Sequence, residues 1–72
     1  GSVTVPLSAI VNRDELTGIY TVSSSNTALL RWVRLGRIYS DRAEVVSGLS
    51  ANEKFIAEAE GKLYNGAPVV TK

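Results

Sequence analysis

Cysteine, histidine and methionine are all absent from this chain of 72 residues. Without cysteine there is no disulfide, no thiolate nucleophile and no sulfur ligand for a metal ion. Without histidine the commonest general base and metal ligand is missing as well. No serine has an evident neighbour to activate it as a nucleophile. The sequence therefore predicts a domain that is not an enzyme and that binds no cofactor or metal.

The remaining motifs that could support chemistry are weak. Asp41 and Glu44 flank a predicted turn and Asp14–Glu15 lie in a predicted loop, where carboxylates are normally solvated and not desolvated for acid–base work. Gly61-Lys62 lacks the upstream glycine spacing of a phosphate-binding loop. These patterns favour a function in binding over one in catalysis.

Strong net charge and long apolar runs are also missing. Eight basic and seven acidic residues give a net charge of +1, so no broad field steers the domain toward nucleic acid or anionic lipid. No apolar run approaches the ~20 residues that span a bilayer. A composition that is 44% hydrophobic and 21% charged predicts one small globular domain.

The first residues, Gly1-Ser2, and the lack of methionine are typical of a vector-derived start joined to an internal segment. We expect residues 1–2 to be such a remnant. Residues 3–72 are then expected to form one β domain that is a fragment of a longer protein.

Alternating and β-branched residues predict strands in the first half of the chain. The odd positions from Val3 to Val11 are apolar, which is typical of one half-buried strand, and Pro6 places that strand at an edge. The polar stretch Asn12–Gly18 is predicted to be a hairpin loop closed by glycine, with Ile19–Val22 as the return strand. Ser23–Asn26 is predicted to be the next turn.

Glycines mark predicted strand ends, bulges and turns in the second half of the chain. Leu29–Leu35 is predicted to be a strand that Gly36 ends or bulges. Ala43–Val46 is predicted to be a short strand, followed by a turn for which Gly48 supplies a positive φ. Together with Gly66, these glycines are assigned to backbone geometry and not to partner contact.

Local rules conflict between Lys54 and Leu63. Ser50-Ala51-Asn52-Glu53 fits a capping box, and the Ala- and Glu-rich residues after it favour a helix. Gly61 and a thin apolar stripe favour a strand instead, and we prefer the strand. With Val69–Val70 as a last strand, the expected fold is mostly β. It is a small antiparallel barrel or sandwich of about six short strands, with or without a short helical turn near 50–60.

Three arginines and two aromatic residues could form a surface for single-stranded nucleic acid: Arg31, Arg34, Arg37, Trp32 and Tyr39. On one regular strand, however, Arg34 points away from Arg31 and Arg37, so the arginines would not form one patch. Trp32 is expected to cover an edge of the core. If it is exposed instead, with Tyr20 or Tyr39, it suits a protein contact better.

Several motifs in order resemble one known family. They are Val5-Pro6-x-Ser8-Ala9-Ile10-Val11, Ile19-Tyr20-x-Val22, Arg31-x-Val33-x-Leu35-Gly36, Glu44-Val45-Val46-Ser47-Gly48-Leu49 and Leu63-x-Asn65-Gly66-Ala67-Pro68-Val69. From Val3 to Val70 the chain resembles the C-terminal, membrane-proximal domain of periplasmic adaptor subunits. These are the membrane fusion proteins of tripartite multidrug efflux pumps of the resistance-nodulation-division type, in Gram-negative bacteria. One departure is Asn52, where the family usually has glycine.

The resemblance implies a non-catalytic β domain in the periplasm, in a parent anchored to or associated with the inner membrane. Its implied partners are an inner-membrane efflux transporter, neighbouring adaptor protomers and, through other domains of the parent, an outer-membrane channel. Our candidate contact residues are Arg34, Arg37 and Tyr39, with the loop from Asn12 to Gly18 as a second possibility.

Two alternatives stay open. The first is the equivalent adaptor domain of an ATP-driven exporter or of a metal-efflux pump, although the lack of His, Met and Cys argues against direct metal handling here. The second is a small nucleic-acid-binding β-barrel, which the near-neutral charge disfavours.

Overall fold

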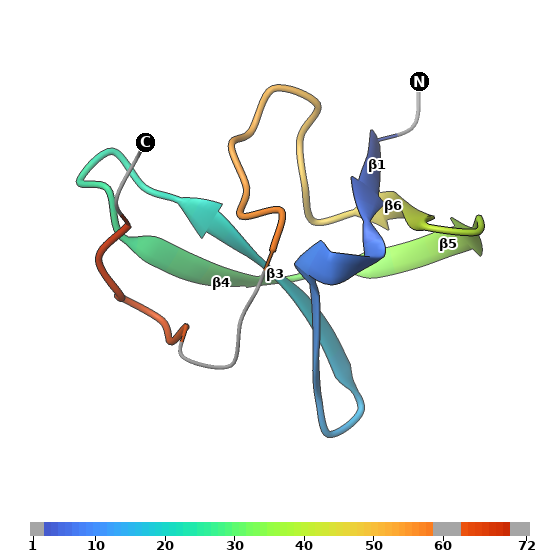
Figure 1. Cartoon of the computed structure of the whole chain (residues 1–72), viewed down its shortest axis with the longest axis horizontal. Helices are drawn as coiled ribbons and strands as arrows, with labels where there is room; N and C mark the ends of the chain where they lie inside the picture. Colours follow the sequence, from blue (N-terminus) through green and yellow to red (C-terminus); the bar gives the residue numbers. More distant parts are fainter. Residues whose placement is uncertain (1–2, 59–62, 70–72) are drawn as a thin grey trace.

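The computed structural model describes residues 3–58 and 63–69, and in these ranges the chain folds into two three-stranded antiparallel sheets (Figure 1). One sheet has the order β1-β6-β5 and the other β2-β3-β4. The elements are β1 (Val3–Pro6), a 3-10 turn η1 (Leu7–Ala9), β2 (Ile10–Arg13), β3 (Leu16–Val22), β4 (Ala28–Trp32), β5 (Arg34–Ile38) and β6 (Arg42–Ser47). The predicted mostly β fold of about six short strands is confirmed, and the sheets are not closed into a barrel. Within the described ranges, no helix has the length and apolar character needed to cross a bilayer.

The prediction of one strand from Val3 to Val11 is wrong. Pro6 has extended backbone angles, φ −63° and ψ 148°, and the 3-10 turn η1 follows it directly. The turn moves the chain from one sheet to the other, so β1 pairs with β6 while β2 pairs with β3. Val5 therefore belongs to one core cluster, while Val11 packs against the other.

The β2–β3 hairpin is tighter than the sequence predicts. Its turn consists of Asp14 and Glu15, and Asp14 has a positive φ of 56°. Gly18 does not close the loop, since it lies inside β3, buried and in register with Trp32. Packing requires glycine at this position, because a Cβ there would lie only 2.8 Å from Leu30 Cδ1.

Strand β3 is paired along both sides. On one side it pairs with β4, and the predicted turn at 23–26 between them is confirmed by the bond from Ser23 N–H to the Thr27 carbonyl at 2.9 Å. On its other side β2 covers only the first half. The second half is completed by the loop after β6, where Ile56 N–H donates to the Tyr20 carbonyl at 2.8 Å.

Residues 54–58 accordingly form neither the preferred strand nor the alternative helix. Phe55 makes a single bridge with Thr21, and residues 57–58 form a bend. The capping-box residues do contact each other, since Glu53 Oε1 accepts the Ser50 N–H at 3.0 Å, but they close only a turn. No helix follows there because the backbone at 54–56 bonds to β3 instead of to itself. The rest of the predicted element, residues 59–62, lies outside the described residues.

The strand predicted over 29–35 is split at Val33. Val33 N–H donates to the Thr17 carbonyl at 2.9 Å, which extends the β2-β3-β4 sheet, whereas Leu35 pairs with Val45 in the other sheet. The predicted bulge at Gly36 is confirmed. Leu35 is in register with Val45 and Ile38 with Ala43, so Gly36 and Arg37 together oppose Glu44.

Two apolar clusters lie on opposite faces of the β2-β3-β4 sheet. They separate because adjacent residues of a strand, here Ile19 and Tyr20, point to opposite sides. The first cluster joins the two sheets and contains Val5, Ala9, Ile19, Val45 and Leu49. The second contains Tyr20, Ala28 and Ala67.

The C-terminal segment 63–69 runs along the edge of β4. Ala28 N–H donates to the Ala67 carbonyl at 2.7 Å and Gly66 N–H to the Ala28 carbonyl at 2.6 Å. Thr27 and Pro68 form an isolated bridge, and Val69 N–H donates to the Asn26 carbonyl at 2.8 Å. Of the predicted last strand, Val69 lies outside any strand and Val70 lies outside the described residues. This segment covers the edge of β4 and one side of Tyr20.

Candidate functional site

The β5–β6 hairpin carries the predicted contact residues at an edge of its sheet. Arg34 and Arg37 lie in β5, Tyr39 follows it, and the hairpin closes through a bond of 2.7 Å from Tyr39 N–H to the Arg42 carbonyl. All three predicted residues are exposed. The hairpin thus brings Arg34, Arg37 and Tyr39 together on one element.

Exposed apolar side chains accompany them. Ile38, Tyr39 and Val46 are 54%, 49% and 55% exposed. We use the name β5–β6 surface for the exposed residues Arg34, Arg37, Ile38, Tyr39 and Val46, which lie on both faces of the hairpin, since Ile38 is in register with the buried Ala43 and Val46 follows the buried Val45. Sequence reasoning missed Ile38 and Val46, because a β-branched residue in a strand is normally a sign of burial.

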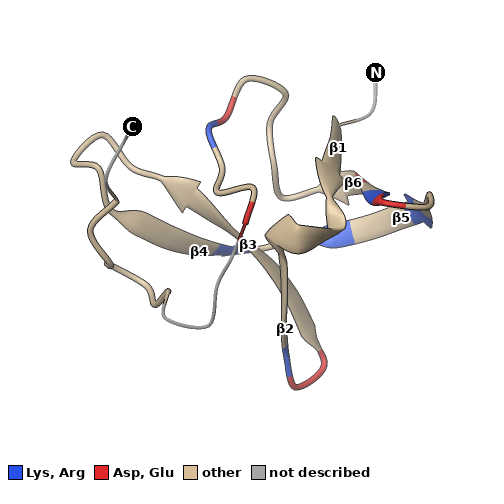
Figure 2. Ribbon diagram, in the orientation of Figure 1, with Lys and Arg blue, Asp and Glu red and all other residues tan. Residues whose placement is uncertain are grey.

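The two arginines of this surface, Arg34 and Arg37, carry guanidinium groups that are available to bind a partner. Within residues 3–58 and 63–69, neither guanidinium has an ion pair or hydrogen bond. Only the backbone N–H of Arg37 is engaged, donating to Glu44 Oε1 at 3.3 Å. Arg42 differs, since its Nη2 donates to the Thr4 carbonyl at 2.9 Å. Figure 2 shows the basic positions along β5 and at the start of β6.

Gly36 shapes the same hairpin. A Cβ at this position would lie 2.5 Å from Glu44 Oε1 and 2.8 Å from Val46 Cγ1. The absence of a side chain therefore leaves room for Glu44 and Val46 beside the bulge in β5. Gly36 acts on this surface through packing and bulge geometry, not as a residue of a turn.

Gly48 and Gly66 have positive φ values of 98° and 94°. A Cβ at Gly48 would lie 2.6 Å from the Trp32 carbonyl oxygen, whereas a Cβ at Gly66 would meet nothing within 4 Å. Gly48 is thus constrained by both conformation and space, and Gly66 by conformation alone. Neither glycine belongs to the β5–β6 surface.

The second candidate, the stretch from Asn12 to Gly18, belongs to the other sheet. Its hairpin projects in a different direction from the β5–β6 hairpin (Figure 1). Asn12 to Leu16 are exposed, while Gly18 is buried and cannot contact a partner. Arg13 Nη2 donates to Tyr20 Oη at 2.9 Å. The two predicted contact regions therefore form two separate surfaces.

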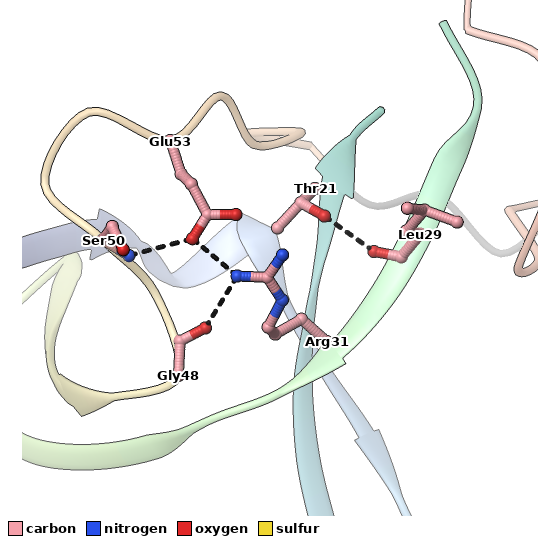
Figure 3. A network of polar contacts seen from close by, with 6 residues as sticks. All are labelled: Thr21, Leu29, Arg31, Gly48, Ser50 and Glu53. Atoms are coloured by element: carbon pink, nitrogen blue, oxygen red, sulfur yellow. Dashed lines mark hydrogen bonds and ion pairs between the residues drawn. The ribbon is translucent and has the colours of Figure 1, made fainter. Parts of the chain in front are cut away.

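The strip of three arginines considered for nucleic acid does not form. Arg31 lies in β4, in the other sheet from Arg34 and Arg37. Its Nη1 donates to Glu53 Oε1 at 2.6 Å and to the Gly48 carbonyl at 3.3 Å (Figure 3). The argument from regular alternation does not apply, because the chain breaks at Val33 and bulges at Gly36.

This network also fixes the charge state of Glu53. The Ser50 N–H, and after it the Arg31 guanidinium, stabilise the carboxylate and hold the pKa of Glu53 below its ordinary value of 4.5, although partial burial opposes them. Arg31 and Glu53 are therefore committed to joining β4 to the loop after β6.

Trp32 packs against the sheet with one part of its ring and is exposed to solvent with the rest. Its ring atoms Cε3 and Cζ3 lie 3.2 Å from the position of a Cβ on Gly18, so the six-membered ring packs over that glycine. It nevertheless stays half exposed. Tyr20 is buried, so it cannot form an exposed aromatic pair with Trp32. Tyr39 is exposed but lies on the β5–β6 hairpin, in the other sheet.

The β5–β6 surface is suited to recognition. Arginine and tyrosine are enriched among the residues that dominate binding energies, and exposed apolar side chains beside them supply burial on association. In the described part of the chain, no group of three or more acidic residues could hold a metal ion.

A protein-family model, described as the YknX C-terminal permuted SH3-like domain, matches residues 2–71. None of the curated proteins matches the chain significantly. The match agrees with the adaptor-type C-terminal domain that the sequence resembles, and it carries no assignment to pumps of the resistance-nodulation-division type.

Proposed function

Because the chain belongs to the family of YknX C-terminal permuted SH3-like domains, which are of the membrane fusion or adaptor type, we propose that it is a non-catalytic docking domain. In this proposal it holds an adaptor protein against an inner-membrane transporter from the periplasmic side. Other domains of the adaptor reach the outer-membrane channel. Neighbouring adaptor protomers share the same transporter.

The observation that carries this proposal is the β5–β6 surface. The guanidinium groups of Arg34 and Arg37 have no partner among the described residues, and the two arginines lie on one hairpin with the half-exposed Ile38, Tyr39 and Val46. A transporter surface with carboxylates next to apolar side chains would complement it in both respects. The contact can be modest and still persist, because the rest of the adaptor raises its effective concentration at the transporter.

The transporter class is part of the proposal. The motifs from Val5 to Val69 favour a proton-driven transporter of the resistance-nodulation-division type. An ATP-driven exporter is the alternative within the same functional class. Binding of the adaptor to one purified transporter of each class would separate them.

Charge reversal on the hairpin tests the docking surface. We expect Arg34→Glu and Arg37→Glu, each made in the adaptor that carries this domain, to weaken binding to the purified transporter at least about fivefold. Lys54→Glu makes the same change in charge at an exposed position outside the β5–β6 surface, and it should leave the affinity unchanged. Surface plasmon resonance on transporter in nanodiscs measures all three. Wild-type affinity in both arginine variants would exclude this surface.

A further inference from the structure

One face of the β2-β3-β4 sheet is covered at one end and open at the other. Alternation places Leu16, Gly18 and Tyr20 on this face. The register adds Trp32 opposite Gly18 and Leu30 opposite Tyr20. The C-terminal segment packs over the Tyr20 end, whereas at the other end Leu16 is 52% and Trp32 46% exposed. We call the open end, formed by Val11, Leu16, Leu30 and Trp32, the Trp32 face.

Trp32 gives this face an aromatic platform. One side of its six-membered ring packs over Gly18, which is buried. The half-exposed remainder of the ring is open to solvent. The face of an indole ring carries a negative potential that attracts the cationic groups of lysine and arginine.

The rim of the Trp32 face carries free negative charge. Asp14 and Glu15 directly precede Leu16, and both are exposed without an ion-pair or hydrogen-bond partner in the described residues. The one cation of this hairpin, Arg13, is in register with Leu16 and so lies on the same face, where its Nη2 donates to Tyr20 Oη. Figure 2 shows the acidic turn at the tip of the β2–β3 hairpin. With two carboxylates and one guanidinium the hairpin tip is net negative, so it attracts the same sign of charge as the face of the Trp32 ring.

We propose that the Trp32 face is a second docking surface, for a protein segment that carries lysine or arginine beside aliphatic side chains. The cation lies over Trp32 and pairs with Asp14 or Glu15, while the aliphatic side chains bury Leu16. This goes beyond the proposed function, since the β5–β6 surface prefers an acidic partner and lies on the other sheet. The domain is then bivalent, with two surfaces of opposite charge preference.

The tryptophan itself reports on this proposal, because the chain contains only one. The probes are two short peptides, one of alternating leucine and lysine and one with glutamate in place of every lysine. Titration of the whole chain with the lysine peptide should give saturable binding and a blue shift of Trp32 emission. The glutamate peptide should give neither. Equal binding of both peptides, or emission that does not change, would overturn the proposal.

Variants distinguish binding that depends on charge from nonspecific apolar binding. Asp14→Asn with Glu15→Gln should weaken binding of the lysine peptide at least about fivefold and reduce its salt dependence, because the ion pairs are lost. Asparagine suits the positive φ of 56° at position 14. Asp41→Asn with Glu58→Gln removes the same charge at two exposed positions outside the Trp32 face and should leave peptide affinity unaltered. Undiminished affinity in the acidic-turn variant contradicts the proposal.

A second copy of the chain is the competing occupant. If Trp32 emission shifts with protein concentration in the absence of peptide, the Trp32 face is a self-association surface and the proposal is wrong. Constant emission over that range supports it. This readout is independent of the transporter assay, so the two proposals can fail separately.

Discussion

Arg31 of β4 and Glu53 of the loop after β6 form an ion pair, with Nη1 2.6 Å from Oε1, although 22 positions separate them in the chain. The same Nη1 reaches the Gly48 carbonyl, and the same Oε1 accepts the Ser50 N–H (Figure 3). The pair thus holds residues 48–53 over β4. The next residues along the chain, 54–56, complete the second side of β3, so this contact supports the sheet as well as the loop.

Replacing Glu53 by glutamine should lower the free energy of unfolding by at most about 1 kcal/mol, because partly exposed ion pairs contribute little. The side chains of Arg31 and Glu53 are 41% and 26% exposed. Glutamine keeps an oxygen for the Ser50 N–H, whereas Glu53→Ala removes it and should destabilise further. Urea unfolding of the three proteins measures both steps. Equal stability of the glutamine variant and wild type would show that the charge contributes nothing.

The contribution of Glu53 should depend on pH in one direction. Its pKa is lowered in the folded state, so the stabilisation is fully present above the unfolded value, near 4.5, and is lost as the pH falls through the lowered folded value. The difference in unfolding free energy between wild type and Glu53→Gln should therefore be constant near neutral pH and shrink below 4.5. Urea unfolding across this range tests it, and a difference that grows on acidification would contradict the sign.

Gly48 and Gly66 form a matched pair for separating backbone strain from steric overlap, because their φ values are nearly equal. Gly66→Ala adds a methyl group in open space and should cost about 1–2 kcal/mol from conformation alone. Gly48→Ala carries the same strain and also meets the Trp32 carbonyl at 2.6 Å, so its loss of stability should be clearly larger. Thermal unfolding compares them. Equal losses would mean that the backbone near Trp32 shifts freely.

Tyr20→Phe should destabilise the domain by about 1–2 kcal/mol, because it removes a hydrogen-bonding group from a buried site. Tyr20 Oη accepts from Arg13 Nη2 at 2.9 Å and donates to the Leu63 carbonyl at 3.1 Å. It therefore ties the β2–β3 hairpin to the C-terminal segment. The exposed Tyr64 offers the control, since Tyr64→Phe should be neutral. Hydrogen exchange should also become faster at Gly66, whose N–H bonds to β4; unchanged exchange would show that the segment holds without Tyr20.

Local patterns predicted the elements whose determinants lie within a few residues. The turn after Val22, the positive φ at Gly48 and the bulge at Gly36 follow from nearby residue types. Predictions failed where a distant partner decides the conformation. Gly18 looks like a turn residue in sequence, but its place inside β3 depends on Leu30 and Trp32 across the strand pair.

The contact surfaces were predictable only in part. Arg34, Arg37 and Tyr39 were predicted as contact residues from residue type, because arginine and tyrosine are common in interfaces. Their exposure agrees with that role, which stays a prediction. The exposure of Ile38 and Leu16 could not be predicted, since an apolar residue in a strand has the same sequence signature on an open face as in a core.

By itself, the sequence determined the mostly β character, the absence of sulfur and imidazole chemistry, and the family, because these depend on composition and local order. Only the tertiary structure decided which strands share a sheet. The break at Val33 and the 3-10 turn after Pro6 send successive strands to different sheets, and strand pairing is a long-range interaction that local propensity does not encode. The same long-range pairing commits Arg31 to Glu53 and places Arg34 and Arg37 in the other sheet, where their guanidinium groups have no partner among the described residues.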